Sequence, residues 1–123
     1  MCLFCDLIND KSCIIDENTL AYTIYDSYPV SQGHVLIIPK RHVSSFFELD
    51  SDETKAVFDL VRKMRDVIEK KYAPHGYNIG VNVDEAAGQT IMHCHIHLIP
   101  RYQGDVENPR GGVRGVIPSK KDY

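Results

Sequence analysis

One long helical pattern in the middle of the chain most constrains how it can fold. Apolar residues recur at helical spacing from near Asp50 or Ser51 until Pro74 ends the pattern, and charged residues take the opposite side. Asp50 and Glu53, three residues apart, resemble a capping box that would begin the helix. The apolar side consists of Val57, Leu60, Val61, Met64, Val67 and Ile68.

Short apolar stretches on both sides of this helix predict strands. The expected strands are residues 14–15, 20–25, 34–39, 77–83 and 91–99, and a short helix over residues 2–9 precedes them. Because strands and helices do not alternate regularly, the fold class is expected to be α+β with a largely antiparallel sheet.

Length, composition and charge exclude several classes of protein. Of the 123 residues, 43% are apolar and 25% charged, so we expect one globular domain over residues 1–123, with residues 101–123 as a C-terminal tail. The longest unbroken apolar run, residues 35–39, is too short to span a bilayer, and because no basic region precedes an apolar stretch in the first residues we expect no secretory signal. We therefore expect no membrane partner and a reducing, cytoplasmic setting. A net charge of −3 argues against a nucleic acid polymer as partner.

Three of the six histidines alternate with other residues near the end of the chain. Successive side chains of a strand point to opposite faces, so His93, His95 and His97 would share one face. Three half-polar rings side by side are costly to bury without a task. At about 3.3 Å per residue the outer two lie roughly 13 Å apart, too far for one metal ion to bind all three. We therefore expect these histidines to have different tasks.

The middle histidine, His95, is the natural nucleophile for phosphorus chemistry, because a neutral imidazole keeps one nitrogen free while the other holds the proton. A protonated His97 would stabilise the charge that develops on the phosphoryl oxygens. Directly ahead of this row, Gly88 permits close approach of the backbone to an anion, and Gln89 and Thr90 supply neutral donors. This turn is therefore a candidate anion site.

Two cysteines, Cys2 and Cys5, lie near the N-terminal end with two residues between them. In a reducing compartment such a pair indicates metal binding or redox chemistry rather than a disulfide. The redox motif is expected between a strand and a helix, so the position of this pair favours metal. The other two cysteines, Cys13 and Cys94, are expected to be packing residues.

The segment His93–Ile99 resembles the motif His-φ-His-φ-His-φ-φ, in which φ is apolar, of the HIT (histidine triad) superfamily of nucleotide hydrolases and transferases. Residues 29–42 are similar to a second signature segment of that family, and Asn82 and residues 88–90 stand at the family spacing before the triad. This resemblance implies a five-stranded, mainly antiparallel sheet with one long and one short helix, commonly in a homodimer.

The resemblance also implies a role for each matching residue. His95 matches the nucleophile that forms a covalent nucleotidyl-histidine at the α-phosphate, and His97 and Gln89 match phosphate contacts that complete the catalytic set. His34 matches a histidine that contacts the triad and supports it without carrying the reaction itself. The implied substrate-binding residues are Asp26 at the ribose, Asn82, Gly88 and Thr90 at the phosphate or leaving group, and His34 in its supporting position.

Relatives in a zinc-bearing branch imply a structural zinc ion held by a Cys-x-x-Cys pair, a mid-chain histidine and the first histidine of the triad. Here these residues are Cys2, Cys5, His42 and His93, a closed tetrahedral set of two thiolates and two imidazoles. Alternatively, both cysteines are reduced core residues and His42 lies on the surface. No organic cofactor is implied.

Together these inferences predict an enzyme that cleaves a purine nucleotide-type small molecule at its α-phosphorus and releases a nucleoside monophosphate. Dinucleoside polyphosphates and nucleoside phosphoramidates are the two competing substrate classes. A metal-dependent hydrolase, in which a catalytic zinc ion activates water, is a second hypothesis. A nucleotide-binding module with little catalysis is a third.

Overall fold

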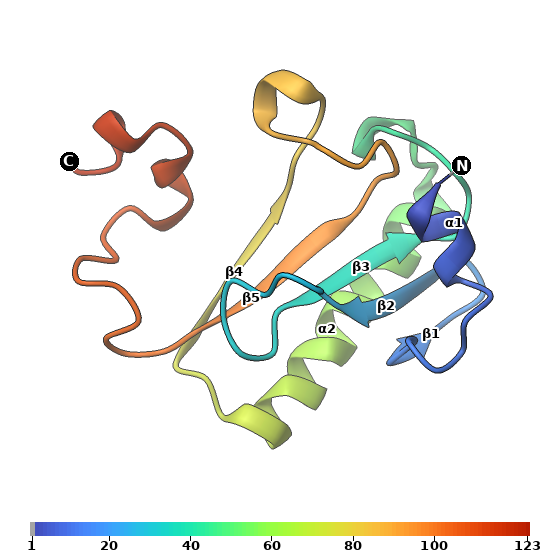
Figure 1. Cartoon of the computed structure of the whole chain (residues 1–123), viewed down its shortest axis with the longest axis horizontal. Helices are drawn as coiled ribbons and strands as arrows, with labels where there is room; N and C mark the ends of the chain where they lie inside the picture. Colours follow the sequence, from blue (N-terminus) through green and yellow to red (C-terminus); the bar gives the residue numbers. More distant parts are fainter. Residues whose placement is uncertain (1) are drawn as a thin grey trace.

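A computed structural model describes residues 2–123 and contains one five-stranded antiparallel sheet (Figure 1). The strands are β1 (Asp16–Glu17), β2 (Ala21–Tyr25), β3 (Val35–Pro39), β4 (Gly76–Val81) and β5 (Ile96–Arg101), in the spatial order β1-β2-β3-β5-β4. The helices are α1 (Leu3–Leu7) and α2 (Ser51–Tyr72), and short 3₁₀ turns cover Phe46–Glu48, Glu85–Ala87, Gly112–Val116 and Pro118–Lys120. The predicted α+β class, with one long and one short helix, is confirmed.

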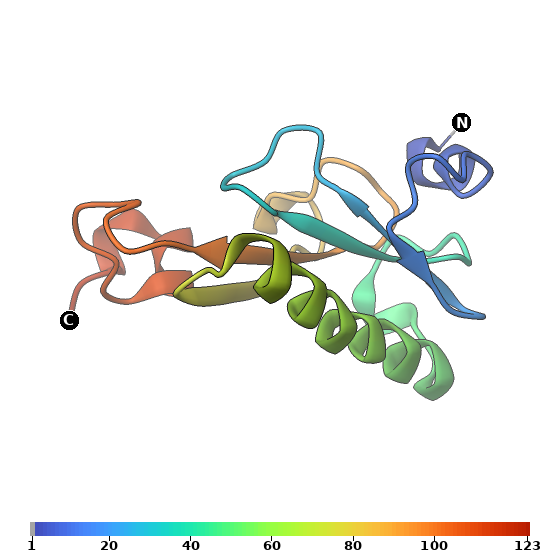
Figure 2. The same cartoon turned by 90° about the horizontal axis from the view of Figure 1, so that it is seen from below.

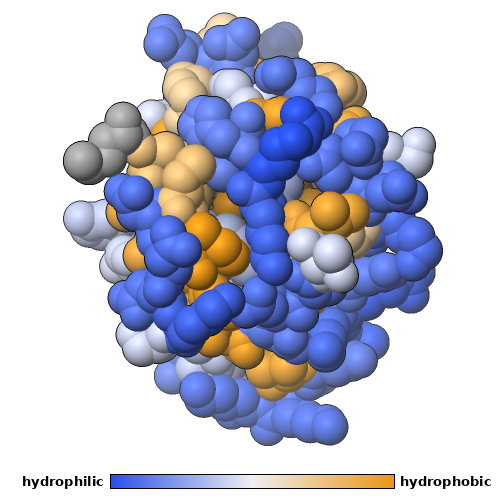
Figure 3. All heavy atoms as spheres, turned by 90° about the vertical axis from the view of Figure 1, so that its right-hand side faces the viewer, coloured by the Kyte–Doolittle hydropathy of each residue, from blue (hydrophilic) through white to orange (hydrophobic). Residues whose placement is uncertain are grey.

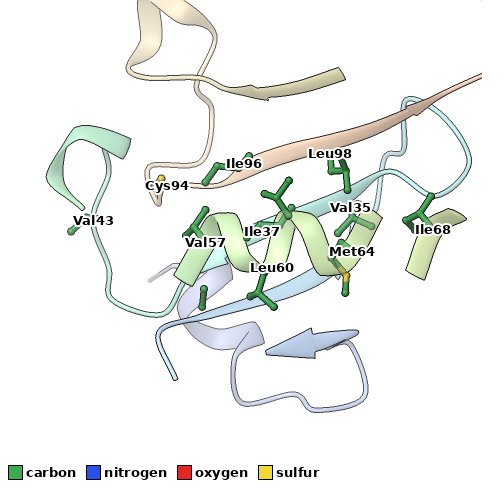
Figure 4. Packing of buried hydrophobic residues seen from close by; sticks show 12 residues of the cluster. Val35, Ile37, Val43, Val57, Leu60, Met64, Ile68, Cys94, Ile96 and Leu98 are labelled. Carbon is green, nitrogen blue, oxygen red and sulfur yellow. The ribbon is translucent and has the colours of Figure 1, made fainter. Parts of the chain in front are cut away.

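The long helix α2 begins at the capping box that the sequence predicts. The Asp50 carboxylate accepts a hydrogen bond from the backbone N–H of Glu53 at 2.8 Å, and the Glu53 carboxylate accepts one from the N–H of Asp50 at 3.0 Å. The helix lies along one face of the sheet (Figure 2), and its apolar side meets β3 and β5 (Figure 4). The buried residues of this core include Val35, Ile37, Val57, Leu60, Met64, Ile68, Ile96 and Leu98.

The short helix α1 lies on the opposite face of the sheet (Figure 2). Its Phe4 is 2% exposed and packs into a second apolar cluster. The Tyr22 hydroxyl donates a hydrogen bond to the Phe4 carbonyl, and burial raises the pKa of that phenol. The other buried members of the cluster are Ile24, Leu36 and Ile38.

β5 begins at Ile96, whereas the sequence predicts a strand from residue 91. The preceding segment turns away from β3, because the Pro39 carbonyl accepts a hydrogen bond from the His93 ring (Nε2···O 2.7 Å) instead of pairing with a backbone N–H. The backbone N–H of Cys94 donates to the carbonyl of Val43, which lies beyond the end of β3, at 2.7 Å. A side chain therefore replaces strand pairing at this point.

The predicted alternation holds on the core side of this segment. Cys94, Ile96 and Leu98 are at most 1% exposed and pack under α2. The prediction for Cys13 is wrong, because this cysteine is exposed and its thiol contacts a carboxylate of Asp10.

β1 comprises Asp16–Glu17, whereas the sequence predicts a strand at residues 14–15. The Asn18 side chain accepts hydrogen bonds from the backbone N–H groups of Leu20 and Ala21, at 3.0 and 2.9 Å. This side-chain turn lies later in the sequence than expected, so Asp16 comes into register with Thr23 of β2.

No helix within residues 2–123 is long and apolar enough to cross a membrane. Seen from the side that carries α1, the surface is mainly hydrophilic, with apolar side chains gathered in small patches (Figure 3). The C-terminal residues extend past β5 at the end of the molecule remote from α1 (Figure 1).

Candidate active site

A cavity of about 300 Å³ opens on the face of the sheet that carries α1. Its apolar wall comes from α1, β2, β3 and the segment before β5: Leu3, Phe4, Leu7, Ile24, Leu36 and Ile91. Its polar wall consists of Asp26, Ser27, Tyr28, Asn82, Gly88, Thr90, His95 and His97. Six residues predicted from the sequence therefore meet at one cavity, whereas two others, His34 and Gln89, do not line it.

His95 is held by its neighbours just before β5 begins. It is 8% exposed, and its Nδ1 lies 2.8 Å from the His93 carbonyl oxygen. A carbonyl oxygen can only accept, so Nδ1 carries the ring proton and Nε2 keeps a free lone pair. The His95 ring also meets the Phe4 ring edge-on, with 5.0 Å between centroids. The nitrogen without a proton is the one that can attack an electrophile.

A chain of hydrogen bonds fixes the proton of His97. The backbone N–H of Val30 donates to Nδ1 of His34 at 3.0 Å, so the proton of neutral His34 is on Nε2. That nitrogen lies 2.9 Å from Nδ1 of His97 and donates to it. The proton of neutral His97 is therefore on Nε2, where it can donate a hydrogen bond. The contact between His34 and the triad that the family resemblance implies is present.

A protonated His97, as expected from the sequence, is not favoured by the surroundings of this ring. Burial, reinforced by the neighbouring His95 and His34, lowers the pKa of the His97 imidazole to about 4. Burial also lowers the pKa of His34, although the nearby Asp26 carboxylate opposes that shift. Both rings are therefore neutral near pH 7, and His97 is a neutral donor rather than a cation.

Asp26 follows β2 and borders the cavity beside these two rings. Its Oδ1 accepts a hydrogen bond from the backbone N–H of Tyr28 at 2.9 Å, and its Oδ2 lies 3.5 Å from Nε2 of His34. The side chain is 18% exposed, so the carboxylate can still accept hydrogen bonds from a bound molecule.

Gln89 shapes the polar loop between β4 and β5 from inside the protein, where it is 3% exposed. Its amide oxygen accepts from the backbone N–H of Asp84 at 2.8 Å. Its amide nitrogen donates to the carbonyls of Ser44 and Ile91 at 2.8 and 3.1 Å. In the same loop Gly88 has a φ of +94°, a left-handed conformation that favours glycine. Gln89 therefore holds the loop whose other residues reach the cavity.

The four predicted metal ligands meet where α1 approaches the sheet. The ligand atoms of Cys2, Cys5, His42 and His93 lie within 4.8 Å of one another. Nδ1 of His93 is 3.4 and 3.6 Å from the two sulfur atoms and 3.1 Å from Nδ1 of His42. Bonds of about 2.0–2.3 Å to a tetrahedral ion separate its ligands by roughly 3.3–3.8 Å, so this donor set fits zinc. The arrangement therefore differs from the alternative in which both cysteines are core residues and His42 lies apart from them on the surface.

Proton positions distinguish this cluster from a second group of potential ligands. His93 donates its Nε2 proton to the Pro39 carbonyl, so its Nδ1 lone pair is free for a metal ion, and burial lowers the pKa of this imidazole. Asp26, His34 and His97 also gather within 4.8 Å. There, however, a backbone N–H occupies the lone pair of neutral His34. That group is suited to passing on hydrogen bonds and not to holding a cation.

Sequence reasoning missed an ion pair at the residue next to His42. The Arg41 guanidinium donates to both carboxylate oxygens of Glu53, at 2.9 and 2.8 Å, and Glu53 is 4% exposed. Arg41 thereby lowers the pKa of the Glu53 carboxyl. Since Glu53 also belongs to the capping box, the chain beside His42 is tied to the first turn of α2. The one feature of the sequence that could have indicated this ion pair is that Arg41 directly precedes the predicted metal ligand His42.

Sequence reasoning also missed the apolar wall of the cavity. The grouping of Leu3, Phe4, Leu7 and Ile8 predicts one face of a short helix, but it does not indicate what that face covers. In the structure the first three side chains contribute to the cavity, whereas Ile8 packs against the adjacent apolar cluster, to which Phe4 also belongs.

Comparisons with known proteins identify the class of this domain. The family model described as the HIT domain matches residues 8–104, and the chain therefore belongs to the HIT family. An uncharacterized HIT-like protein of Methanocaldococcus jannaschii is 41% identical over 111 residues, which cover 87% of this chain and 84% of that protein. The crystal structure of a HIT family protein from Bacillus anthracis matches with a TM-score of 0.79 at 35% identity, covering 85% of this chain and 75% of that chain.

Three further matches bear on ligands and activity. A zinc-bound histidine triad family protein from Mycobacterium smegmatis has a TM-score of 0.78 at 27% identity, covering 87% of this chain and 79% of that chain. An adenylylsulfatase of Arabidopsis thaliana is 38% identical over 85% of this chain and 54% of its own length. An AP-4-A phosphorylase of Mycobacterium tuberculosis is 31% identical over 80% of this chain and 51% of its own length. The matches to these two enzymes thus span about half of each.

Proposed function

We propose that this protein is a nucleotide hydrolase or nucleotidyl transferase that cleaves nucleoside phosphate derivatives at the α-phosphate. The observation that carries the proposal is the free Nε2 lone pair of His95, which borders the same cavity as the neutral donor His97. Membership of the HIT family, with an adenylylsulfatase and an AP-4-A phosphorylase among the relatives, supports the same chemistry. The reaction proceeds through a covalent nucleotidyl-His95 and releases a nucleoside monophosphate.

In the first step, Nε2 of His95 attacks the α-phosphorus. The P–N bond forms as the bond to the leaving group breaks, and the leaving group departs with that electron pair; the nitrogen of a phosphoramidate also takes up a proton from solvent as it leaves. The Nδ1 proton stays on the hydrogen bond to the His93 carbonyl, which stabilises the positive charge that the imidazole acquires. His97 donates from Nε2 to a phosphoryl oxygen. Water then attacks the phosphorus: the P–O bond forms as the P–N bond breaks, the electron pair returns to Nε2 of His95, and the proton that the water loses passes to solvent.

In this proposal the apolar wall and the polar wall of the cavity contact different parts of the substrate. The apolar side chains of α1 and β2, with Phe4 among them, suit a flat purine base. The Asp26 carboxylate suits the ribose hydroxyls. Gln89, expected among the phosphate contacts, acts in this proposal by holding its loop. The residues assigned to the phosphate and leaving group are Asn82, Gly88 and Thr90.

The charge of the cavity favours a substrate with a single phosphate. Asp26 is the one carboxylate in the lining, and the lining residues include no Lys or Arg. A dinucleoside polyphosphate would bring several negative charges to a wall without cations, and unpaired charges are costly where water is excluded. Nucleoside phosphoramidates, and other nucleotidyl derivatives with one phosphate, are therefore the preferred class over dinucleoside polyphosphates.

We also propose a structural zinc ion at Cys2, Cys5, His42 and His93. Four protein ligands leave no open coordination position, so a zinc ion bound there supplies folding free energy rather than an activated water. The zinc-bound relative from Mycobacterium smegmatis and the free Nδ1 of His93 support this site. A catalytic zinc ion is less favoured, because His95 is not in the cluster.

Replacement of the nucleophile tests the proposed reaction. His95→Asn removes the free imidazole nitrogen, and turnover of adenosine phosphoramidate and diadenosine tetraphosphate should fall by roughly a thousandfold or more. Binding of adenosine monophosphate and zinc content should stay near the wild-type values, because neither depends on that lone pair. Mass spectrometry after rapid denaturation should find a nucleotidyl adduct on the wild type and none on the variant.

Ordinary turnover by His95→Asn would contradict the assignment of the nucleophile. Complete loss of turnover on chelation, with the fold retained, would favour the catalytic-metal hypothesis instead. Normal binding of adenosine monophosphate without turnover of any substrate would favour a binding module.

A further inference from the structure

The helix α1 belongs to two sites at once. Cys2 at its N-cap and Cys5 within it are part of the candidate metal centre, whereas Phe4 between them lines the cavity. The Phe4 ring meets two rings of the triad edge-on, His93 with 5.8 Å between centroids and His95 with 5.0 Å. One side chain therefore contacts both a proposed metal ligand and the proposed nucleophile.

This helix has little stability of its own. It contains five residues, no side chain caps its N-terminus, and helices this short are not stable in isolation. Three features attach it to the sheet: the burial of Phe4, the hydrogen bond from the Tyr22 hydroxyl to the Phe4 carbonyl, and the cysteines on either side of Phe4 that enter the cluster. The position of Phe4 therefore depends on what holds the two cysteines.

We propose that Phe4 is a positioning residue that couples the metal centre to His95. This inference rests on the proposed function, since it concerns the nucleophile of that reaction. When the metal ion is bound, Cys2 and Cys5 hold α1 so that the Phe4 ring restrains the His95 ring and keeps Nε2 toward the cavity. Without the ion, α1 shifts, the ring contact loosens, and a smaller fraction of His95 is oriented for attack.

His93 offers a second connection between the two sites, because its ring belongs to the cluster and its carbonyl accepts from His95. The two routes are separable by mutation. Phe4→Leu removes the ring contact and leaves the hydrogen bonds of His93 and both cysteines in place. Leucine keeps most of the apolar volume, so the cavity wall is largely retained.

A cycle of four protein states tests the coupling: wild type and Phe4→Leu, each with zinc and after chelation, with zinc content checked by metal analysis. In the wild type, zinc removal should lower kcat about tenfold, the size of effect seen when residues supporting a metal site are lost, with little change in KM. Phe4→Leu with zinc should show a similar loss of kcat, and any rise in its KM reports the separate contact of Phe4 with the base. Zinc removal from the variant should then add nothing, because both changes break the same contact.

The matched control is Phe47→Leu, at a side chain that is 81% exposed and outside the cavity lining. This variant should show the full effect of zinc removal. Losses that multiply independently in Phe4→Leu, or a wild-type kcat for that variant with zinc, would overturn the coupling.

NMR of the His95 ring protons provides a readout that needs no turnover. Their chemical shifts should move on zinc removal in the wild type and stay nearly constant in Phe4→Leu; equal movement in both would also overturn the coupling. If no protein turns over any nucleotide, the proposed function fails, and this NMR comparison still decides the coupling. Thermal unfolding of each state separates loss of positioning from loss of fold, and Phe4→Met replaces Phe4→Leu if the latter does not fold.

Discussion

At the scale of residues, backbone groups assign the proton positions in this site. The Pro39 carbonyl accepts from the His93 ring, and the His93 carbonyl accepts from the His95 ring. The Val30 N–H donates to the His34 ring, which in turn donates to His97. Three similar imidazoles thereby receive different functions, with free Nδ1 in His93, free Nε2 in His95 and a donating Nε2 in His97. Their alternation predicts different tasks, but the acting nitrogen depends on groups far away in the sequence: the Pro39 carbonyl is 54 residues from His93, and the His34 ring is 63 residues from His97.

The low pKa of His97 gives the stability of the protein a defined pH dependence. An imidazole in the unfolded chain has a pKa near 6.5, whereas burial, with His95 and His34, lowers that of native His97 to about 4. Between about pH 6.5 and 4 the unfolded chain binds a proton that the native protein does not, so the free energy of unfolding falls as the pH falls. The expected loss is on the order of 2–3 kcal/mol by pH 4.

Urea unfolding of the chelated protein between about pH 4.5 and 7.5 measures this dependence without acid release of metal. His97→Asn should make the pH dependence of the free energy of unfolding shallower, and His34 and His93, whose pKa values burial also lowers, account for the part that remains. His75→Asn, at an exposed histidine remote from the cavity lining, should leave it unchanged. Equal slopes for the wild type and His97→Asn would show that His97 is not the group responsible.

At the scale of elements, α2 is the part of the fold that the sequence predicts best. Its expected bounds agree with Ser51–Tyr72, because a capping box and amphipathic spacing are local signals. The start of β5 and the inward orientation of Gln89, unlike the bounds of α2, cannot be predicted from local sequence signals. They depend on hydrogen bonds to Pro39 and Ser44, which are distant in the sequence and carry no local signal. For the same reason, most of the predicted site residues reach one cavity, but Gln89 does not.

The attachment of α1 leads to a prediction about zinc. Cys5→Ser removes one sulfur ligand, so zinc content should fall from one ion per chain toward none. The melting temperature should drop by several degrees, because a metal ion that binds the native protein stabilises it. Cys13→Ser is the matched control, since Cys13 is an exposed cysteine outside the cluster. Full zinc content in Cys5→Ser after dialysis would exclude the proposed ligand set.

At the scale of the whole molecule, a groove of about 670 Å³ separates α2 from the edge strand β4. Phe58 and Ile79 in this groove are 42% and 49% exposed, and an open strand edge is a site for pairing with another chain. We propose this face as the interface with a second copy in the homodimer that the family resemblance implies. The remaining lining residues are Val61, Arg62, Arg65, Asp66, Tyr77 and Leu98.

Sedimentation velocity tests this interface. The wild type should sediment as a dimer, and Phe58→Lys should shift it toward monomer, because a charge would be buried without a partner. Phe47→Lys, which adds the same charge at an exposed phenylalanine outside the groove, should remain dimeric. A monomeric wild type would rule out the dimer, and an unchanged Phe58→Lys would place the interface elsewhere.

The two-sided pattern of β5 also affects how the sheet assembles. Because strand side chains alternate with a period of two, a slip of one residue against β3 would bury His97 under α2 and turn Ile96 and Leu98 toward the cavity. Such a chain would lose apolar burial and desolvate a polar ring in the same event. His97, which is proposed to contact the phosphate, therefore also disfavours wrong registers of β5 during folding, since a slip by one residue is penalised on both faces of the sheet.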